Sequence, residues 1–213
     1  MKNTPSKTSV RRKSSEDSGS TRLTRDDWLD AAFAAVVEGG FDAVRVLSLA
    51  EQLKVTRGSF YWHFEDHAQL IDALVSRWCE AERVEHKRLM AIETDDPRAD
   101  LAQILREALD YAGAKLENVR FELALRGLGR RSTSVADQLA AIDQDRMKLF
   151  VEKFMRITQD IMRATDLAAL FYLAVVGSYQ ALARPHSPAV IKDFLQDLIR
   201  RYVIEHPKAA PRP

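Results

Sequence analysis

The chain has 213 residues, of which 46% are hydrophobic and 30% are charged, and its formal net charge is +1 at pH 7. These proportions are ordinary for a soluble globular protein with one or two compact domains. The single cysteine, Cys79, excludes an internal disulfide and indicates a reducing compartment. The polar N-terminus lacks the apolar segment of a signal peptide, and the most apolar run, residues 167–176, is shorter than the ~20 residues of a membrane span. We therefore expect a cytoplasmic protein.

The first 23 residues differ from the rest of the chain in composition. Residues 1–23 are rich in Ser, Thr, Lys and Arg, show no apolar periodicity and carry six basic side chains against two acidic ones. We expect a disordered basic arm, which is either a solubilising tail or a source of phosphate or minor-groove contacts to DNA. Residues 24–77 carry five basic side chains against nine acidic ones. This balance is unfavourable for DNA binding unless the arm supplies the missing positive charge.

The first helix is predicted to begin after Thr24, because Asp27 three residues later completes a capping-box-like pair. Apolar side chains then recur at helical spacing from Trp28 to Val36. The helix is expected to stop at the glycine pair 39–40.

Residues 47–64 predict a helix-turn-helix. Leu49, Ala50 and Leu53 form one apolar face of a short helix, and 54–55 form the turn. Thr56 is a suitable N-cap for a second helix at about 57–64.

The second of these helices places large amphipathic side chains on its outer side. Phe60 and Phe64 share one face at a spacing of four residues, and we expect that face to be buried. The residues left facing outward are Arg57, Ser59, Tyr61, Trp62 and His63. One interpretation is a solvated helix with some aromatic packing on a neighbour. The other is a recognition helix, because a DNA major groove accepts a helix of this size.

The remainder of the chain predicts further helices. A fourth begins near Asp66, with Gln69 three residues on, and runs towards Met90. The later helices are expected at 100–116, about 119–128, about 135–158, 166–183 and 188–203, with a loop at 127–134 and a disordered tail at 207–213. Ser187 and Pro188 have the order of an N-cap followed by a first-turn proline.

The segment from Thr56 to Phe64, followed by Asp66 and Leu70, resembles the recognition segment of the TetR (tetracycline repressor-like) family of bacterial transcriptional regulators. The resemblance extends back to Trp28 and covers roughly residues 24–77. There are departures: Lys54 stands where the family usually has the turn glycine, and this suggests a slightly different turn. Leu47 and His67 are further departures, because many members have arginine and lysine at these two positions.

The resemblance implies an all-α fold with a three-helix DNA-binding head at 24–70. Helix 4 would link this head to a helical ligand-binding and dimerisation domain at 71–206. It also implies a regulator, most readily a repressor, that binds a palindromic operator as a dimer and is released by a small molecule. An activator, or a regulator without a ligand, is the alternative. No cofactor is implied.

The resemblance also assigns DNA-binding residues. Arg57 and Ser59 would face base edges, Tyr61 and His63 would touch phosphates, and Trp62 would pack against sugar-phosphate or a thymine methyl. Further contacts to the DNA backbone are expected from Gly58, Arg45, Thr56 and His67.

In the second domain, the family's inducer site lies among the middle helices, and the aromatic side chains there are otherwise core residues. Candidates for the ligand site are His86, Phe121, Glu122, Phe150 and Tyr172. The homodimer would form through the helices at about 166–183 and 188–203, where Ala168, Gly177 and Ala181 are small enough for close approach.

The alternatives to a DNA-binding regulator are a metal-binding protein, an enzyme and a structural helical protein. His63 and His67 have a spacing that suits zinc on a helix, but the His-Glu-x-x-His order is absent, so we expect no metal site. An enzyme is disfavoured because no phosphate loop, nucleophile elbow or ligand cluster is visible. A structural helical protein leaves the outward Tyr61, Trp62 and His63 unexplained.

Overall fold

The computed structural model describes residues 23–114, 116–182 and 189–205, and every regular element in these ranges is helical. The all-α prediction is therefore confirmed. The elements are α1 (Arg25–Gly39), a 3₁₀ turn (Phe41–Ala43), α2 (Val46–Gln52), α3 (Arg57–Phe60), α4 (His67–Met90), α5 (Pro97–Ala114), α6 (Leu116–Gly129), α7 (Thr133–Thr158), α8 (Ile161–Leu182), α9 (Ala189–Ile199) and a π-helical turn (Arg200–Glu205). The predicted arm up to residue 22, the 187–188 cap and the 207–213 tail lie outside the described residues.

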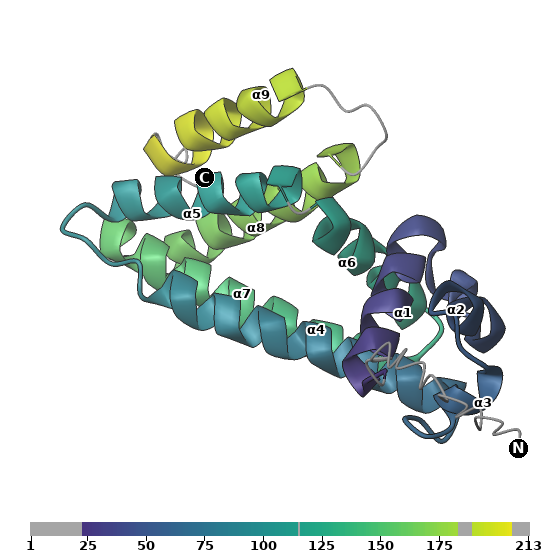
Figure 1. The fold of residues 1–213 in the computed structure, drawn as a ribbon. Coiled ribbons are helices and arrows are strands. Elements are labelled where there is room, and N and C mark those ends of the chain that lie inside the picture. The colour runs from purple at the N-terminus through teal and green to yellow at the C-terminus, as the bar shows by residue number, and fades with distance from the viewer. Residues whose placement is uncertain (1–22, 115, 183–188, 206–213) are drawn as a thin grey trace, which may run out of the picture.

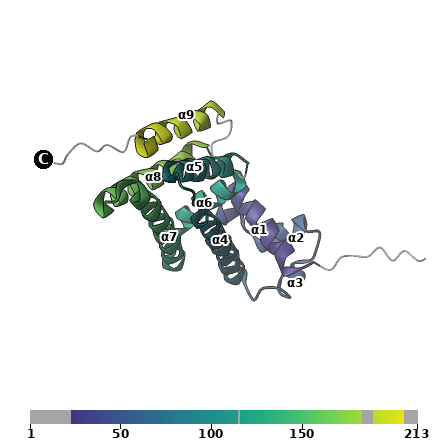
Figure 2. The ribbon, with the colours of Figure 1, turned by 90° about the vertical axis from the view of Figure 1, so that its left-hand side faces the viewer.

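Helices α1, α2 and α3 form a head around the start of α4, which runs away from the head beside α7 (Figures 1 and 2). Helices α5, α8 and α9 lie at the far end, and α7 packs most extensively against α8. One apolar cluster joins the head and the first half of α4 to Phe121 and Leu125 of α6 and to three side chains of α7. A second cluster is formed mainly by α5, α7 and α8. The head is therefore attached to the rest of the protein through α6 as well as α4.

The predicted helix starts in the head agree with the structure. The Asp27 amide donates to Thr24 Oγ1 at 3.3 Å and the Thr24 amide donates to Asp27 Oδ2 at 2.6 Å, which is a capping box. The Asp66 side chain caps α4 by accepting from the Gln69 amide at 2.8 Å. These caps are local interactions, so the sequence order alone was sufficient to predict them.

Several predicted helix boundaries were wrong. The loop expected at 127–134 is mostly helical, because α6 continues through Gly129 and α7 begins at Thr133, where the Ser132 side chain caps it. Gly129 lies against Leu139 of α7, where an added Cβ would come within 3.1 Å, so close helix packing explains a glycine in the helix. Helix α8 begins at Ile161 rather than 166, because the Asp160 carboxylate accepts from the amides of Met162 and Arg163.

The C-terminal end of α4 is tied to α7 by a buried cation. Lys153 is 3% exposed and donates from Nζ to the Met90 carbonyl at 3.1 Å and the Ile92 carbonyl at 2.5 Å. These carbonyls lie at the end of α4, where a positive charge interacts favourably with the helix dipole. The end of α4 distant from the head is therefore anchored in the second domain.

Candidate nucleic-acid interface and ligand cavity

The helix-turn-helix is held by aromatic packing beneath α3. Phe60 is fully buried and meets Trp28 of α1 edge-on at a centroid distance of 5.3 Å. It stacks on Phe64 at 5.4 Å, as the spacing of the two residues predicted. Because three rings interlock under α3, its outer side is presented on a fixed support.

Helix α3 is shorter than the predicted 57–64. It ends at Phe60, and the next residues form a tighter turn in which the Tyr61 amide donates to the Gly58 carbonyl and the Trp62 amide to the Ser59 carbonyl, both at 3.3 Å. Thr56 occupies the N-cap position, but its side chain makes no capping hydrogen bond. The outward segment is therefore one helical turn followed by a 3₁₀-like turn.

The turn between α2 and α3 contains a backbone conformation that residues other than glycine rarely adopt. Lys54 has φ of 57°, in the left-handed region, at the position where the resemblance placed a departure from glycine. We expect Lys54→Gly to raise the free energy of unfolding by about 0.5–1 kcal/mol, because glycine removes the Cβ strain at some cost in unfolded-state entropy. Urea denaturation would measure the change. Lys54→Ala is the control, because alanine keeps the Cβ; an equal gain in both variants would contradict the backbone explanation.

The outer side of α3 and of the turn that follows it carries three of the side chains that were predicted to face outward, Arg57, Tyr61 and Trp62. Trp62 is 83% exposed and Tyr61 51% exposed. The Arg57 guanidinium donates to the Tyr61 hydroxyl at 3.0 Å and lies over its ring, so the two side chains are held together. Ser59 and His63 are half-buried. The arrangement presents a guanidinium, a phenol and an indole on one surface.

The other predicted contacts border this surface. Arg45 is exposed at the N-cap of α2. His67 opens α4, and its Nε2 lies 2.7 Å from the Val44 carbonyl oxygen, which leaves only Nδ1 for another partner. Within the described ranges, no group of three or more His, Cys, Asp or Glu side chains is placed to hold a metal ion.

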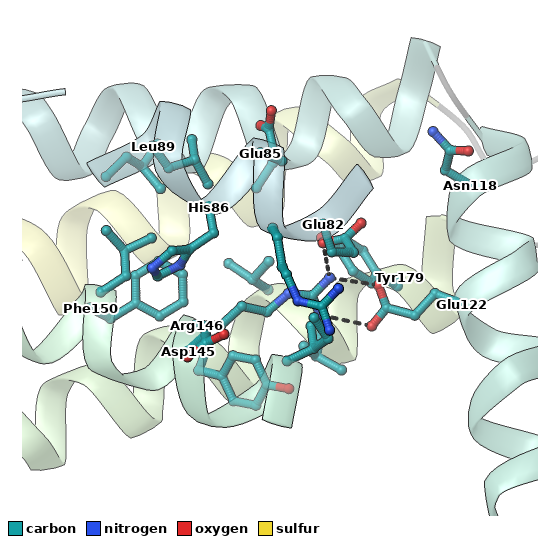
Figure 3. A pocket seen from close by; sticks show the side chains of 18 of the residues that line it. Glu82, Glu85, His86, Leu89, Asn118, Glu122, Asp145, Arg146, Phe150 and Tyr179 are labelled. Carbon is teal, nitrogen blue, oxygen red and sulfur yellow. Dashed lines mark hydrogen bonds and ion pairs between the residues drawn. The ribbon is translucent and has the colours of Figure 1, made fainter. Parts of the chain in front are cut away.

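A cavity of about 70 Å³ lies between α4, α5, α6, α7 and α8 (Figure 3). Four of the five predicted ligand-site residues line it: His86, Glu122, Phe150 and Tyr172. Nδ1 of His86 is buried and has no hydrogen-bond partner. The cavity therefore combines apolar walls with one unsatisfied polar atom.

Phe121 does not line the cavity, which corrects its assignment to the ligand site. Its fully buried ring stacks on Phe33 at 4.9 Å and meets Phe41 at 5.6 Å, so it belongs to the core under the head. Successive helical residues point about 100° apart, and the neighbouring Glu122 consequently faces the cavity while Phe121 faces α1.

One wall of the cavity is a buried network of ion pairs that the sequence analysis did not identify. Arg146 donates to Glu82 at 2.7 Å and to Glu122 at 2.9 and 3.0 Å. Arg126 donates to Glu122 and to Asp143, which also accepts from the Tyr172 hydroxyl at 2.5 Å. The only signal in the sequence was the spacing of Glu82 and His86 on one face of α4, which does not reveal partners on α7.

These contacts shift the pKa values in opposite directions. Burial raises the pKa of Glu82 above 4.5, and Arg146 compensates only in part. For Glu122, burial also acts to raise the pKa, but the two guanidiniums outweigh it and hold the pKa below its usual value. Burial and the hydrogen bond to Asp143 raise the pKa of Tyr172 to about 12. Glu82 is therefore the least compensated carboxylate in the network.

The outer side of α8 and α9 is apolar. Ile161–Ala181 has a mean hydropathy of 1.4 and is long and apolar enough to cross a membrane by length and composition, so its apolar part exceeds the predicted 167–176. The core helix of a soluble protein meets the same criterion, and α8 buries one face against α7. Large apolar side chains that are exposed among the described residues include Leu170 and Leu173 of α8, Phe194 and Leu198 of α9, and Tyr202 of the π-helical turn.

Among the small residues expected at a close helix contact, Gly177 is exposed, with no atom within 4 Å of an added Cβ, and Ala181 is half-buried. Ala168 is fully buried in the second cluster, which corrects its placement at a subunit contact.

Comparison with known proteins gives a consistent picture. Residues 29–74 match the family model described as bacterial regulatory proteins, tetR family. The chain is 32% identical over 96 residues to the tetracycline repressor protein class G of Vibrio anguillarum, which is 45% of this chain and 43% of that protein. It thus spans less than half the length of this curated relative.

Solved structures share the whole fold. A transcriptional regulator from Rhodococcus sp. Rha1 superposes with a TM-score of 0.72 at 18% identity and covers 89% of this chain and 100% of its own. A putative transcriptional regulator from Saccharomonospora viridis in complex with choline has a TM-score of 0.68 at 16% identity, covering 85% and 98%.

Proposed function

The chain belongs to the tetR family of bacterial regulatory proteins, and on that premise we propose that it is a cytoplasmic DNA-binding regulator rather than an enzyme. Its activity is repression of transcription from a palindromic operator, relieved by a small molecule. The observation that carries the proposal is the surface of Arg57, Tyr61 and Trp62, which is exposed above a rigid aromatic support.

In this proposal the DNA contacts divide by chemistry. Arg57 and Ser59 read base edges, since a guanidinium donates two hydrogen bonds to guanine. Tyr61 and His63 bind phosphates and Trp62 packs on the sugar-phosphate backbone or a thymine methyl. The remaining backbone contacts come from Arg45, Thr56, Gly58 and His67. The domain boundaries are those of the sequence: the arm at 1–23, the head at 24–70, the second domain at 71–206 and the tail at 207–213.

A palindromic operator requires two heads about 34 Å apart or a multiple of that distance. The exposed apolar side chains of α8 and α9 support a homodimer formed through these two helices, because a large apolar surface on a soluble protein marks an interface. The second copy would cover the same side chains by symmetry.

The cavity supports regulation by a ligand. It borders α4, which begins in the head and is anchored at its other end by Lys153. A ligand that displaces the middle of α4 changes the spacing of the two heads. Release follows if the ligand binds the altered spacing more tightly than the DNA-binding one.

The proposal is tested by selecting genomic DNA fragments with the purified full-length protein at a stated salt concentration. Recovery of one palindromic motif upstream of a few genes is the expected result. Recovery of no motif, with binding lost at modest salt, would show that only non-specific phosphate contacts exist.

We expect Arg57→Ala to weaken binding to the selected operator by about 1–3 kcal/mol, because a base contact is lost while phosphate contacts remain. Fluorescence anisotropy with a labelled operator would measure it. The control is Arg98→Ala, which removes the same charge from an exposed position in the first turn of α5, outside the head. Equal affinity of the Arg57 variant and the wild type would refute the assignment of this residue.

A further inference from the structure

The charges around the cavity are predominantly negative. The lining includes four carboxylates and two guanidiniums: Glu82, Glu85, Glu122, Asp145, Arg83 and Arg146. Two of the outer members are paired near the surface, Arg83 with Glu80 and Glu85 with Arg88, and the third, Asp145, is exposed. The inner wall therefore presents Glu82 and Glu122 against the single guanidinium of Arg146.

The guanidiniums of the buried ion-pair network do not fully balance the negative charge of the inner wall. Arg146 serves both Glu82 and Glu122, and Arg126 divides its hydrogen bonds between Glu122 and Asp143. Three carboxylates thus share two guanidiniums, and the side chains of Glu82 and Glu122 are only 11% and 5% exposed. A buried carboxylate without full compensation is costly, and a cation that enters beside it recovers that cost.

Aromatic rings of the cavity suit the apolar part of a cation. The rings of Phe150, Tyr172 and Tyr179 line the cavity, and an aromatic face attracts a nearby ammonium group. The buried Nδ1 of His86, which lies next to Phe150 in Figure 3, lacks a protein partner and is available to a hydroxyl or an N–H of a ligand.

We propose that the effector of this regulator is a small organic cation, an amine or quaternary ammonium, bound with its charge beside Glu82 and its apolar body against Phe150 and Tyr172. This assignment rests on the proposed function of the cavity as the effector site. An anionic effector does not fit, because Arg146 is already occupied by two carboxylates.

The test compares three probes of nearly equal shape and different charge, with the full-length protein at pH 7. Choline is the cation, 3,3-dimethylbutan-1-ol replaces its nitrogen by carbon and is neutral, and 3,3-dimethylbutanoate is an anion. Calorimetric titration is expected to show choline binding at least tenfold more tightly than the alcohol, with no binding of the anion. Equal binding of choline and the alcohol, or binding of the anion alone, would overturn the proposal, as would failure of all three to bind.

The site is tested by Glu82→Gln, for which we expect choline affinity to fall at least tenfold while affinity for the neutral alcohol is unchanged. Glu80→Gln is the matched control, because Glu80 lies on the same helix, is exposed and does not line the cavity. Unaltered choline affinity in the Glu82 variant would overturn the site. If that variant does not fold, the three-probe comparison on the wild type decides the question by itself.

Operator binding measured on the same preparations separates this proposal from the one on which it rests. A wild type that binds its operator but shows no preference for the cation refutes only the ligand class. A wild type that binds no specific DNA refutes the regulator, whichever probe it binds.

Discussion

Arg146→Ala is expected to lower the free energy of unfolding by about 3–5 kcal/mol, the usual cost of removing one partner from a buried ion pair. The guanidinium is 17% exposed and is shared by Glu82 and Glu122. Its removal leaves both carboxylates in a poorly solvated wall with Arg126 as the remaining cation. Urea denaturation at pH 7 would measure the loss.

The control for this prediction is Arg83→Ala. Arg83 lies on α4 near the same cavity, but its side chain is 53% exposed and its ion pair with Glu80 is open to solvent. We expect a loss of about 1 kcal/mol or less from this variant. Comparable losses in the two variants would show that burial of the Arg146 network contributes little.

The pH dependence of the Arg146 variant distinguishes charge from packing. In the wild type, the lowered pKa of Glu122 contributes stability that is present above the ordinary value of 4.5 and is lost as the pH falls through the lower folded value. Without Arg146 the folded pKa of both glutamates rises, and protonation then relieves the buried charge. The difference in stability should therefore be largest near neutral pH, begin to shrink as the pH falls through these raised values, and shrink further below 4.5. A difference that is constant with pH would indicate lost packing instead.

Leu173→Glu is expected to convert the proposed dimer to a monomer and to weaken operator binding at least 100-fold, equivalent to about 2.7 kcal/mol or more. Leu173 is 65% exposed on α8, on the same side as Leu170 and Gly177. A carboxylate there costs little in the monomer, but it would be buried without a partner in the interface. Each head would then bind its half-site alone. Light scattering and operator titration measure the two effects.

The matched control is Val84→Glu, which places the same charge at a 59% exposed apolar side chain on α4, in a hollow lined by residues of α1, α4 and α6. It should change neither the mass in solution nor the operator affinity. A Leu173 variant that remains dimeric would exclude this stretch of α8 from the interface.

Local features of the sequence determined where α1 and α4 begin and where α1 ends. The Thr24–Asp27 pair, the Asp66–Gln69 pair and the glycine that ends α1 act within one turn of backbone, so residue order was sufficient. The burial of Phe60 and Phe64 also followed from their spacing. The exposed aromatic side chains of the recognition segment and the resemblance to the TetR family came from the same short stretch.

The boundaries that were wrong depended on contacts between distant segments. Gly129 remains helical because α6 packs closely on α7 there, although glycine has a low intrinsic preference for helix. Helix α3 ends at Phe60, and the turn that follows returns Phe64 to the core shared with α1. Tertiary packing overrides local preference in both cases.

The cavity residues could likewise be predicted from the sequence only in part. The sequence by itself determined that aromatic and polar side chains such as His86, Phe150 and Tyr172 were available in the second domain. It could not separate Phe121, which supports the head, from Glu122, which faces the cavity, because that depends on how α6 is rotated against α1 and α7. Only the tertiary structure decided that Glu82 and Arg146 form one buried wall, since the two residues are 64 positions apart in the chain and no local periodicity encodes a pairing across helices.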